Sequence, residues 1–441
     1  MLTFISLVFF GLLLLGTPIG FALGITAVLS LAKLGGISQL PVLLNPGSDV
    51  FIFKMVCQRF YAGLDMFTLM AMPFFIFAGA IMNKTGITHR LVKFSNVLVG
   101  HLRGGLAHAN IMASIFFSGM TGAAVSDTAA IGTMLIPAMV DEGYDKDYSA
   151  AVTAASSIIG PTIPPSNMMV IYGSLMSVSI AGLFAAGFLP GLLIAAFLMI
   201  MAGYIAKKRN YPKNPRSNLK EVLNATKDAI IPLLMPIIIL GGILTGIFTP
   251  TEAAAVAVGY AFVIGFFVLR TLKLNDIPEL LYQTGKTTGV VFLIIGSASI
   301  LGWVLTMERV PEAVAAGLLS ISNNPHVVLL LILVLMLIVG MFMDIAAALI
   351  ILGPILHPIA VNNLGIHPIH FGIIMVLSLN LALMTPPVGA CLFVACGISK
   401  LSLEQLTRAI WPFIVVVMIA LFIIAYWSGL VLLIPRMLGL A

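Results

Sequence analysis

Two carboxyl side chains, Asp127 and Asp344, lie deep within long apolar stretches of the sequence. Asp127 is the only Asp, Glu, Lys or Arg between Arg103 and Asp141, and Asp344 is the only one in residues 313–399. An ionisable group in an apolar run is costly to bury and by default marks a functional site. We therefore expect each carboxylate either to bind a cation or to hold an irregular backbone by accepting hydrogen bonds.

Small and hydroxyl-bearing residues surround Asp127 in the segment 118–128 (Ser-Gly-Met-Thr-Gly-Ala-Ala-Val-Ser-Asp-Thr). Its glycines favour a break in the helix, and exposed backbone groups at membrane depth need protein, water or an ion to satisfy them. Carbonyl, hydroxyl and carboxylate oxygens are the ligands that a hard cation such as Na⁺ prefers. We predict the tip of a re-entrant helical hairpin here. The alternative is the close helix packing that small residues also permit.

Proline clusters interrupt two other apolar runs. Three prolines fall within five residues of the segment 160–167, and they remove backbone donors that a regular helix needs. We predict a helix that is broken at mid-membrane, with a second half that begins near Ser166 and points its N-terminal amides at an anionic substrate. The segment 384–389 (Met-Thr-Pro-Pro-Val-Gly) repeats the pattern. An ordinary proline kink is the alternative at each place.

The elements that position these residues must be membrane helices. The chain has 441 residues, of which 60% are hydrophobic and 9% charged, and its mean hydropathy is +1.14. Soluble domains carry roughly 25% charged residues, so a soluble enzyme is excluded. The apolar runs are continuous rather than alternating, which argues against a β-barrel. We predict an all-α polytopic membrane protein, in which the uncharged residues 1–32 form a retained first span.

Charge and internal similarity predict the topology. Lysine and arginine gather at 84–103, at 207–227 and at 270–286, which the positive-inside rule places in the cytoplasm. The motif Asp-x-Ala-Ala, with a proline ten residues after the aspartate, occurs at Asp127 and again 217 residues later at Asp344. The loop after a helix of the first copy is basic, whereas the loop after the matching helix of the second copy carries both acidic and basic residues. We therefore predict inverted-topology repeats, each with a re-entrant hairpin and a proline-broken helix.

The predicted organisation has five segments. They are N-terminal scaffold helices at 1–65, a first inverted repeat at 66–206 (hairpin tip 118–128, broken helix 160–167), a cytoplasmic basic connection with scaffold helices at 207–286, a second inverted repeat at 287–399 (tip 340–346, broken helix 384–389) and a C-terminal helix at 400–441.

Four segments in order, 118–129, 160–166, 340–347 and 385–389, resemble the large membrane subunit (M or DctM-type component) of the tripartite ATP-independent periplasmic (TRAP) transporters. The resemblance spans essentially the whole chain. It implies an elevator-type secondary importer in the bacterial inner (cytoplasmic) membrane, without enzymatic activity. It further implies symport of a carboxylated solute, such as a C4-dicarboxylate or a sialic acid, with Na⁺. The implied partners are a small four-helix membrane subunit, expected as a separate chain, and a periplasmic substrate-binding protein.

The resemblance also implies two or more Na⁺ ions, with one site in each repeat, where a hairpin tip meets a broken helix. The expected Na⁺-binding residues are Ser118, Gly119, Thr121, Gly122, Ser126, Asp127, Gly160, Pro164, Gly340, Asp344, Thr385 and Pro386. The expected substrate-binding residues are Thr162, Ser166, Asn167, Thr385 and Gly389.

Coupling to protons instead of Na⁺ fits the same architecture. Two intramembrane aspartates could also form the proton-sharing dyad of an aspartyl protease, although the Gly-x-Gly-Asp pattern of that class is absent and the broken helices would then have no role. A passive channel would need a continuous polar stripe, which the sequence lacks. We find no basic groove with interleaved aromatic residues for nucleic acid.

Overall fold

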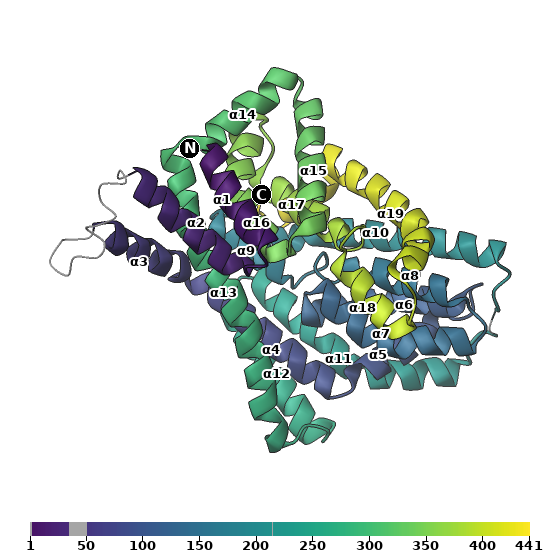
Figure 1. Ribbon diagram of the computed structural model, residues 1–441. Coiled ribbons are helices and arrows are strands. Elements are labelled where there is room, and N and C mark those ends of the chain that lie inside the picture. The colour runs from purple at the N-terminus through teal and green to yellow at the C-terminus, as the bar shows by residue number, and fades with distance from the viewer. Residues whose placement is uncertain (1, 35–50, 214) are drawn as a thin grey trace.

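The computed structural model describes residues 2–34, 51–213 and 215–441, in which helices are joined by turns (Figure 1). Eight helices within these ranges are long and apolar enough to cross a membrane, and no strand occurs in them. The predicted all-α polytopic membrane fold is confirmed.

The N-terminal residues form two helices instead of the single span predicted over 1–32. Helix α1 (Leu2–Leu14) and helix α2 (Ile19–Leu34) pack against one another across a short turn. Gly16 in that turn has a φ of +79°, which favours glycine, and Pro18 directly precedes α2, where its missing N–H costs no helical hydrogen bond. The single-span prediction is therefore wrong, since hydropathy alone does not register a turn between two apolar helices. A third helix, α3, covers Phe51–Leu64.

The first predicted repeat holds seven α-helices. They are α4 (Ala71–Lys84), α5 (Ile87–Val99), α6 (Gly105–Thr121), α7 (Ala124–Asp141), α8 (Lys146–Ser156), α9 (Asn167–Leu175) and α10 (Ile180–Lys208). Two long helices, α11 (Leu219–Leu244) and α12 (Pro250–Val263), follow. The Thr249 side chain accepts a hydrogen bond from the Glu252 N–H, and the Glu252 carboxylate accepts one from the Thr249 N–H at 2.8 Å. Glu252 thus caps α12, as an acid three residues after a threonine predicts.

The order of elements recurs in the second half. Its helices are α13 (Ile277–Met307), α14 (Val310–Ile321), α15 (Pro325–Phe342), α16 (Ile345–Pro358), α17 (Pro368–Ala382) and α18 (Ala390–Ser399). The segment predicted as one C-terminal helix contains two, α19 (Leu403–Tyr426) and α20 (Ser428–Met437). Helix α19 takes the place in the second half that α10 takes in the first.

The two halves exchange the helices that follow their breaks, because each of these helices packs against the other half. Helix α18 of the second half packs against α7 and α8 of the first, and α9 of the first packs against α16 of the second. Figure 1 shows α18 and α19 (yellow) beside α7 and α8 (blue). A second group is formed by α4, α12 and α13, because α4 packs along both of the others.

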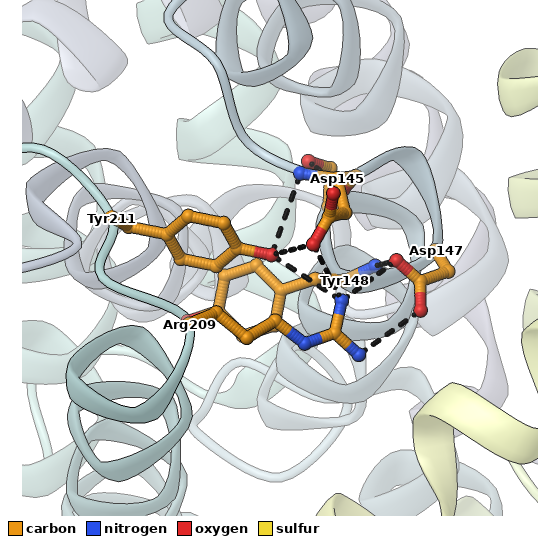
Figure 2. A network of polar contacts seen from close by, with 6 residues as sticks. Asp145, Asp147, Tyr148, Arg209 and Tyr211 are labelled. Atoms are coloured by element: carbon orange, nitrogen blue, oxygen red, sulfur yellow. Dashed lines mark hydrogen bonds and ion pairs between the residues drawn. The ribbon is translucent and has the colours of Figure 1, made fainter.

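An ionic cluster fastens the start of α8 to the end of α10 (Figure 2). Arg209 donates hydrogen bonds of 2.9 Å to both Asp145 and Asp147, and the Tyr211 hydroxyl donates to Asp145 at 2.7 Å. Burial alone would raise the pKa of Asp147, but the hydrogen bonds from Arg209 and from the Tyr148 N–H outweigh it, so this pKa lies below its usual range. The cluster therefore fixes the helix that leads into the first proline-rich break.

Candidate functional site

The first predicted hairpin tip is a two-residue turn between α6 and α7. Gly122 has a φ of +58°, and Ala123 is extended before α7 begins. A Cβ atom on Gly122 would lie 2.9 Å from the Pro165 carbonyl oxygen, so the tip touches the first proline-rich break. Gly119 and Thr121 lie at the end of α6, and their side-chain positions fall outside the described residues.

Asp127 lies in the first turn of α7 and has no exposed surface. A Cβ atom on Gly160 would collide with its Oδ2 atom, so the break backbone passes directly over the carboxylate. Cys391 of α18 hydrogen-bonds with Thr128, close enough to Asp127 to interact with its charge. Because a buried carboxylate is costly unless donors or a cation compensate it, this position suits an ion ligand or a backbone clamp.

The first broken helix ends its regular part at Ser156, continues as a 3₁₀ turn to Ile159, and resumes as α9 after Ser166. The Ser166 hydroxyl donates to the Pro161 carbonyl at 2.6 Å and caps α9 by accepting from the Met169 N–H at 3.4 Å. The peptide bond between Pro164 and Pro165 is cis. The predicted start of the second half-helix is thus confirmed.

The second hairpin tip places a carboxylate at the start of α16. Asp344 is the N-cap residue, and its Oδ1 accepts a hydrogen bond from the Ala346 N–H at 2.9 Å. Its side chain is exposed, unlike that of Asp127. Gly340, one turn before the tip, lies against α17, where a Cβ atom would come within 2.7 Å of Ala382.

The second break lies between α17 and α18. The Thr385 hydroxyl donates to the Leu381 carbonyl at 2.8 Å, and the Pro386–Pro387 peptide bond is cis, as in the first break. Gly389 ends the break with a φ of +49°, which favours glycine. Both halves therefore interrupt a helix at a proline pair.

One cavity of about 670 Å³ brings these interruptions together. The first tip contributes Gly122–Ser126, the first break Pro161 and Asn167, the second tip Asp344–Ala346, and the second break Leu383. The opposite wall belongs to α4 and to the N-terminal part of α13. The cavity therefore lies between the group of helices that carries the interruptions and the group that contains α4 and α13.

The predicted site residues separate into those that line this cavity and those behind it. Gly122, Ser126, Asn167 and Asp344 line it. The buried residues behind the first tip and break are Ser118, Asp127, Gly160, Thr162, Pro164 and Ser166. Gly340, Thr385, Pro386 and Gly389 are likewise not part of the lining.

Two residues that were predicted to bind the substrate use their hydroxyl groups to donate to backbone carbonyls. Thr162 donates to the Ile158 carbonyl at 2.8 Å, and Ser166 bonds the Pro161 carbonyl as described above. Of the five predicted substrate-binding residues, Asn167 is the one that lines the cavity.

Several polar residues near the site were not predicted from the sequence. On the cavity wall these are Asn83 and Lys84 of α4 and Gln283, Thr284 and Thr287 of α13. Positions 283, 284 and 287 share one face of a helix, which could have indicated a polar stripe. Behind the cavity, Asn380, near the end of α17, donates to the Thr162 hydroxyl at 3.5 Å and links α17 to the first break.

The two aspartates have different surroundings. Asp127 is buried under Gly160, whereas Asp344 caps α16 and faces the cavity. A proton-sharing protease dyad needs two carboxylates in one environment. Across the described ranges, no group of three His, Cys, Asp or Glu that could hold a metal ion is found.

Comparison with known proteins gives consistent matches along the chain. Residues 6–430 match the family model described as "Tripartite ATP-independent periplasmic transporter, DctM component". The chain is 42% identical to the sialic acid TRAP transporter large permease protein SiaM of Vibrio cholerae, over 97% of this chain and 96% of that protein. It is 37% identical to the C4-dicarboxylate TRAP transporter large permease protein DctM of Pseudomonas aeruginosa, over 93% and 95%. The fold also resembles the YdaH transporter of Alcanivorax borkumensis, with a TM-score of 0.57 at 14% identity, over 88% of this chain and 90% of that one.

Proposed function

Because the chain belongs to the DctM-component family of the TRAP transporters, we propose that it is the membrane pathway of a Na⁺-coupled secondary importer for a small carboxylated solute. The observation that carries this proposal is the single cavity, to which two hairpin tips and two broken helices contribute. Discontinuous helices at the interface of repeats are where secondary transporters bind solutes and coupling ions.

The chemistry of the cavity supports an anionic solute. Asn167, the first residue of α9, and Ile345, the first residue of α16, both line it. The N-terminal N–H groups of a helix favour negative charge. The relatives named above for sialic acid and for C4-dicarboxylates are consistent with a carboxylate.

Na⁺ coupling is supported by the oxygen-bearing groups at the tips. Asp127 lies under the break backbone, and Asp344 lies at the second tip. In this proposal Na⁺ reduces the charge of these carboxylates, so that a carboxylated solute can approach them. The buried Asp127 would then stabilise the first ion, together with backbone oxygens of the tip and of the break.

An elevator motion is supported by how the helices are grouped. The exchange of α9 and α18 between the halves ties both hairpins and both breaks into one unit. The cavity lies between this unit and α4 with α13. We infer that the unit slides along α4 and α13, and that the repeats are inverted in the membrane. The small membrane subunit, the periplasmic binding protein and the bacterial inner membrane complete the proposal.

Reconstitution tests the proposal. Proteoliposomes that contain the chain with its small membrane subunit are supplied with the binding protein and with labelled succinate or N-acetylneuraminate. We expect uptake of one of them when an inward Na⁺ gradient is imposed. Uptake that follows a pH gradient and ignores Na⁺ would establish the proton-coupled alternative. A transporter that takes up neither carboxylate, with a binding protein shown to hold one, would contradict the proposed function.

A further inference from the structure

The cavity has one cationic residue on its wall. Of the residues that line it, the charged ones are Lys84 and Asp344. Asp344 lies at the hairpin tip, and its carboxylate repels a carboxylated solute. Lys84 is the last residue of α4, on the opposite wall, and its side chain is 47% exposed.

A fixed carboxylate holds Lys84 in place. The Lys84 Nζ atom lies 3.1 Å from Oδ1 of Asp276, just before α13 begins. The other oxygen, Oδ2, accepts a hydrogen bond of 3.0 Å from the Lys273 N–H. An ammonium group has three N–H donors. One engages Asp276, so Lys84 can donate to a solute while it stays anchored.

The other hydroxyl groups on this wall are poor donors for a solute. Thr284 donates to the Leu280 carbonyl at 2.8 Å, and Thr287 donates to the Gln283 carbonyl at 3.1 Å. The carboxamide of Gln283 has two N–H donors, one of which bonds Glu279 at 3.2 Å. Donors for a carboxylate are therefore concentrated in Lys84 with its neighbouring carboxamides.

The place of Lys84 indicates the step at which it acts. The cavity lining reaches Val291 on α13 and goes no further, although the helix continues to Met307. The lined part adjoins the basic connection that the positive-inside rule assigns to the cytoplasm. Lys84 thus stands between the hairpin tips and the cytoplasmic end of the cavity.

We propose that Lys84, anchored by Asp276, is the residue that receives the carboxylate of the solute as it leaves the hairpin tips for the cytoplasm. This proposal rests on the proposed function above. It assigns a specificity role to the wall formed by α4 and α13, because an ammonium group binds a carboxylate more strongly than a neutral solute.

Exchange transport isolates this step. Proteoliposomes of known orientation, carrying the chain with its small subunit, exchange external labelled succinate or N-acetylneuraminate for the same unlabelled compound inside. The half-saturating concentration of the internal compound is measured. Lys84→Met should raise it about tenfold or more, as expected for loss of a charge-assisted hydrogen bond. Lys84→Arg should stay within about threefold.

Two further variants separate recognition from folding. Lys93→Met is the matched control, because Lys93 is also paired with an aspartate, at 3.7 Å from Asp228, but does not line the cavity. It should leave the half-saturating concentration unchanged. Asp276→Asn should raise that concentration less than Lys84→Met does, because the ammonium group remains while its fixed anchor is lost. If Asp276→Asn and Lys84→Met raise the half-saturating concentration equally, the effect comes from loss of the ion pair alone and the role of Lys84 in recognition is overturned.

The outcomes distinguish the two proposals. If the wild-type protein exchanges a carboxylate and Lys84→Met behaves like Lys93→Met, the role of Lys84 is overturned and the proposed function stands. If the wild-type protein exchanges neither carboxylate, both proposals fail together.

Discussion

The carboxylate of Asp127 occupies the space that a Cβ atom on Gly160 would fill. These residues come from α7 and from the break that follows α8, so this contact fixes the first hairpin to the first broken helix.

Gly160→Ala should sharply reduce transport. The new methyl group must displace Asp127 or the break backbone, and such overpacking costs about 1–3 kcal/mol. Initial uptake in proteoliposomes and unfolding in detergent are the measurements. Gly397→Ala is the matched control, because a Cβ atom at Gly397 meets nothing within 4 Å. Equal uptake by the two variants would show that the contact is dispensable.

Asp127→Ala should abolish transport while membrane insertion persists. Removal of the buried carboxylate deletes the proposed ion ligand, and α7 remains one of many packed helices. Membrane fractionation and Na⁺-dependent uptake measure the two effects. If the variant takes up solute at the wild-type rate, Asp127 has no part in the mechanism.

Two substitutions of Asp344 separate the effect of its charge from its role as a helix cap. Asparagine caps helices about as well as aspartate, whereas alanine costs about 1 kcal/mol. We expect both Asp344→Asn and Asp344→Ala to lose Na⁺-dependent uptake, and only the alanine variant to unfold more readily. Normal uptake by Asp344→Asn would mean that the residue serves as a cap alone.

The Tyr172–His357 hydrogen bond joins α9 to α16 across the two halves. The Tyr172 hydroxyl lies 2.6 Å from Nδ1 of His357, and the tyrosine is fully buried. Tyr172→Phe should lower the free energy of unfolding by about 1 kcal/mol in a denaturant titration. Tyr426→Phe, which removes an exposed hydroxyl that donates to the His326 carbonyl, should have a smaller effect. The reverse order would contradict a stabilising contact between the halves.

The free energy of unfolding should fall in acid, because protonation of Asp147 weakens its ion pair with Arg209. The pKa of Asp147 lies below its usual value of about 3.9, so the carboxylate stabilises the fold above that pH and the contribution disappears as the pH falls through the lowered pKa. Because both partners are about one-third exposed, we expect a contribution of about 1 kcal/mol. Arg209→Ala should flatten the dependence of unfolding on pH between about 5 and 3. Arg408→Ala, which breaks the exposed pair with Glu404, should not.

The interruptions of the helices could be predicted because their causes are local. Gly122 must adopt a positive φ, and paired prolines cannot continue a helix, wherever they lie in the fold. The directions in which side chains point could be predicted less well from the sequence. Thr162 and Ser166 are hydroxyl residues at the predicted place, yet both turn toward their own backbone carbonyls.

The opposite wall of the cavity could not be predicted, because tertiary packing creates it. Lys84 and Gln283 are nearly 200 positions apart in the chain, and only the packing of α4 on α13 brings them to one cavity. A basic residue after an apolar helix indicates on which side of the membrane the helix ends. This signal is the same whether the residue lies in an exposed loop or on the wall of a cavity. The turn at Gly16 escaped prediction for a related reason, since apolar residues flank it on both sides.

The exchange of α9 and α18 means that neither half of the protein can change position by itself. A displacement of the first hairpin pulls on a helix that belongs to the second half, and the reverse holds equally. In the proposed mechanism, ions held at either tip cross the bilayer in the same stroke as the solute, and a variant that loosens the packing of α9 and α18 would transport one without the other.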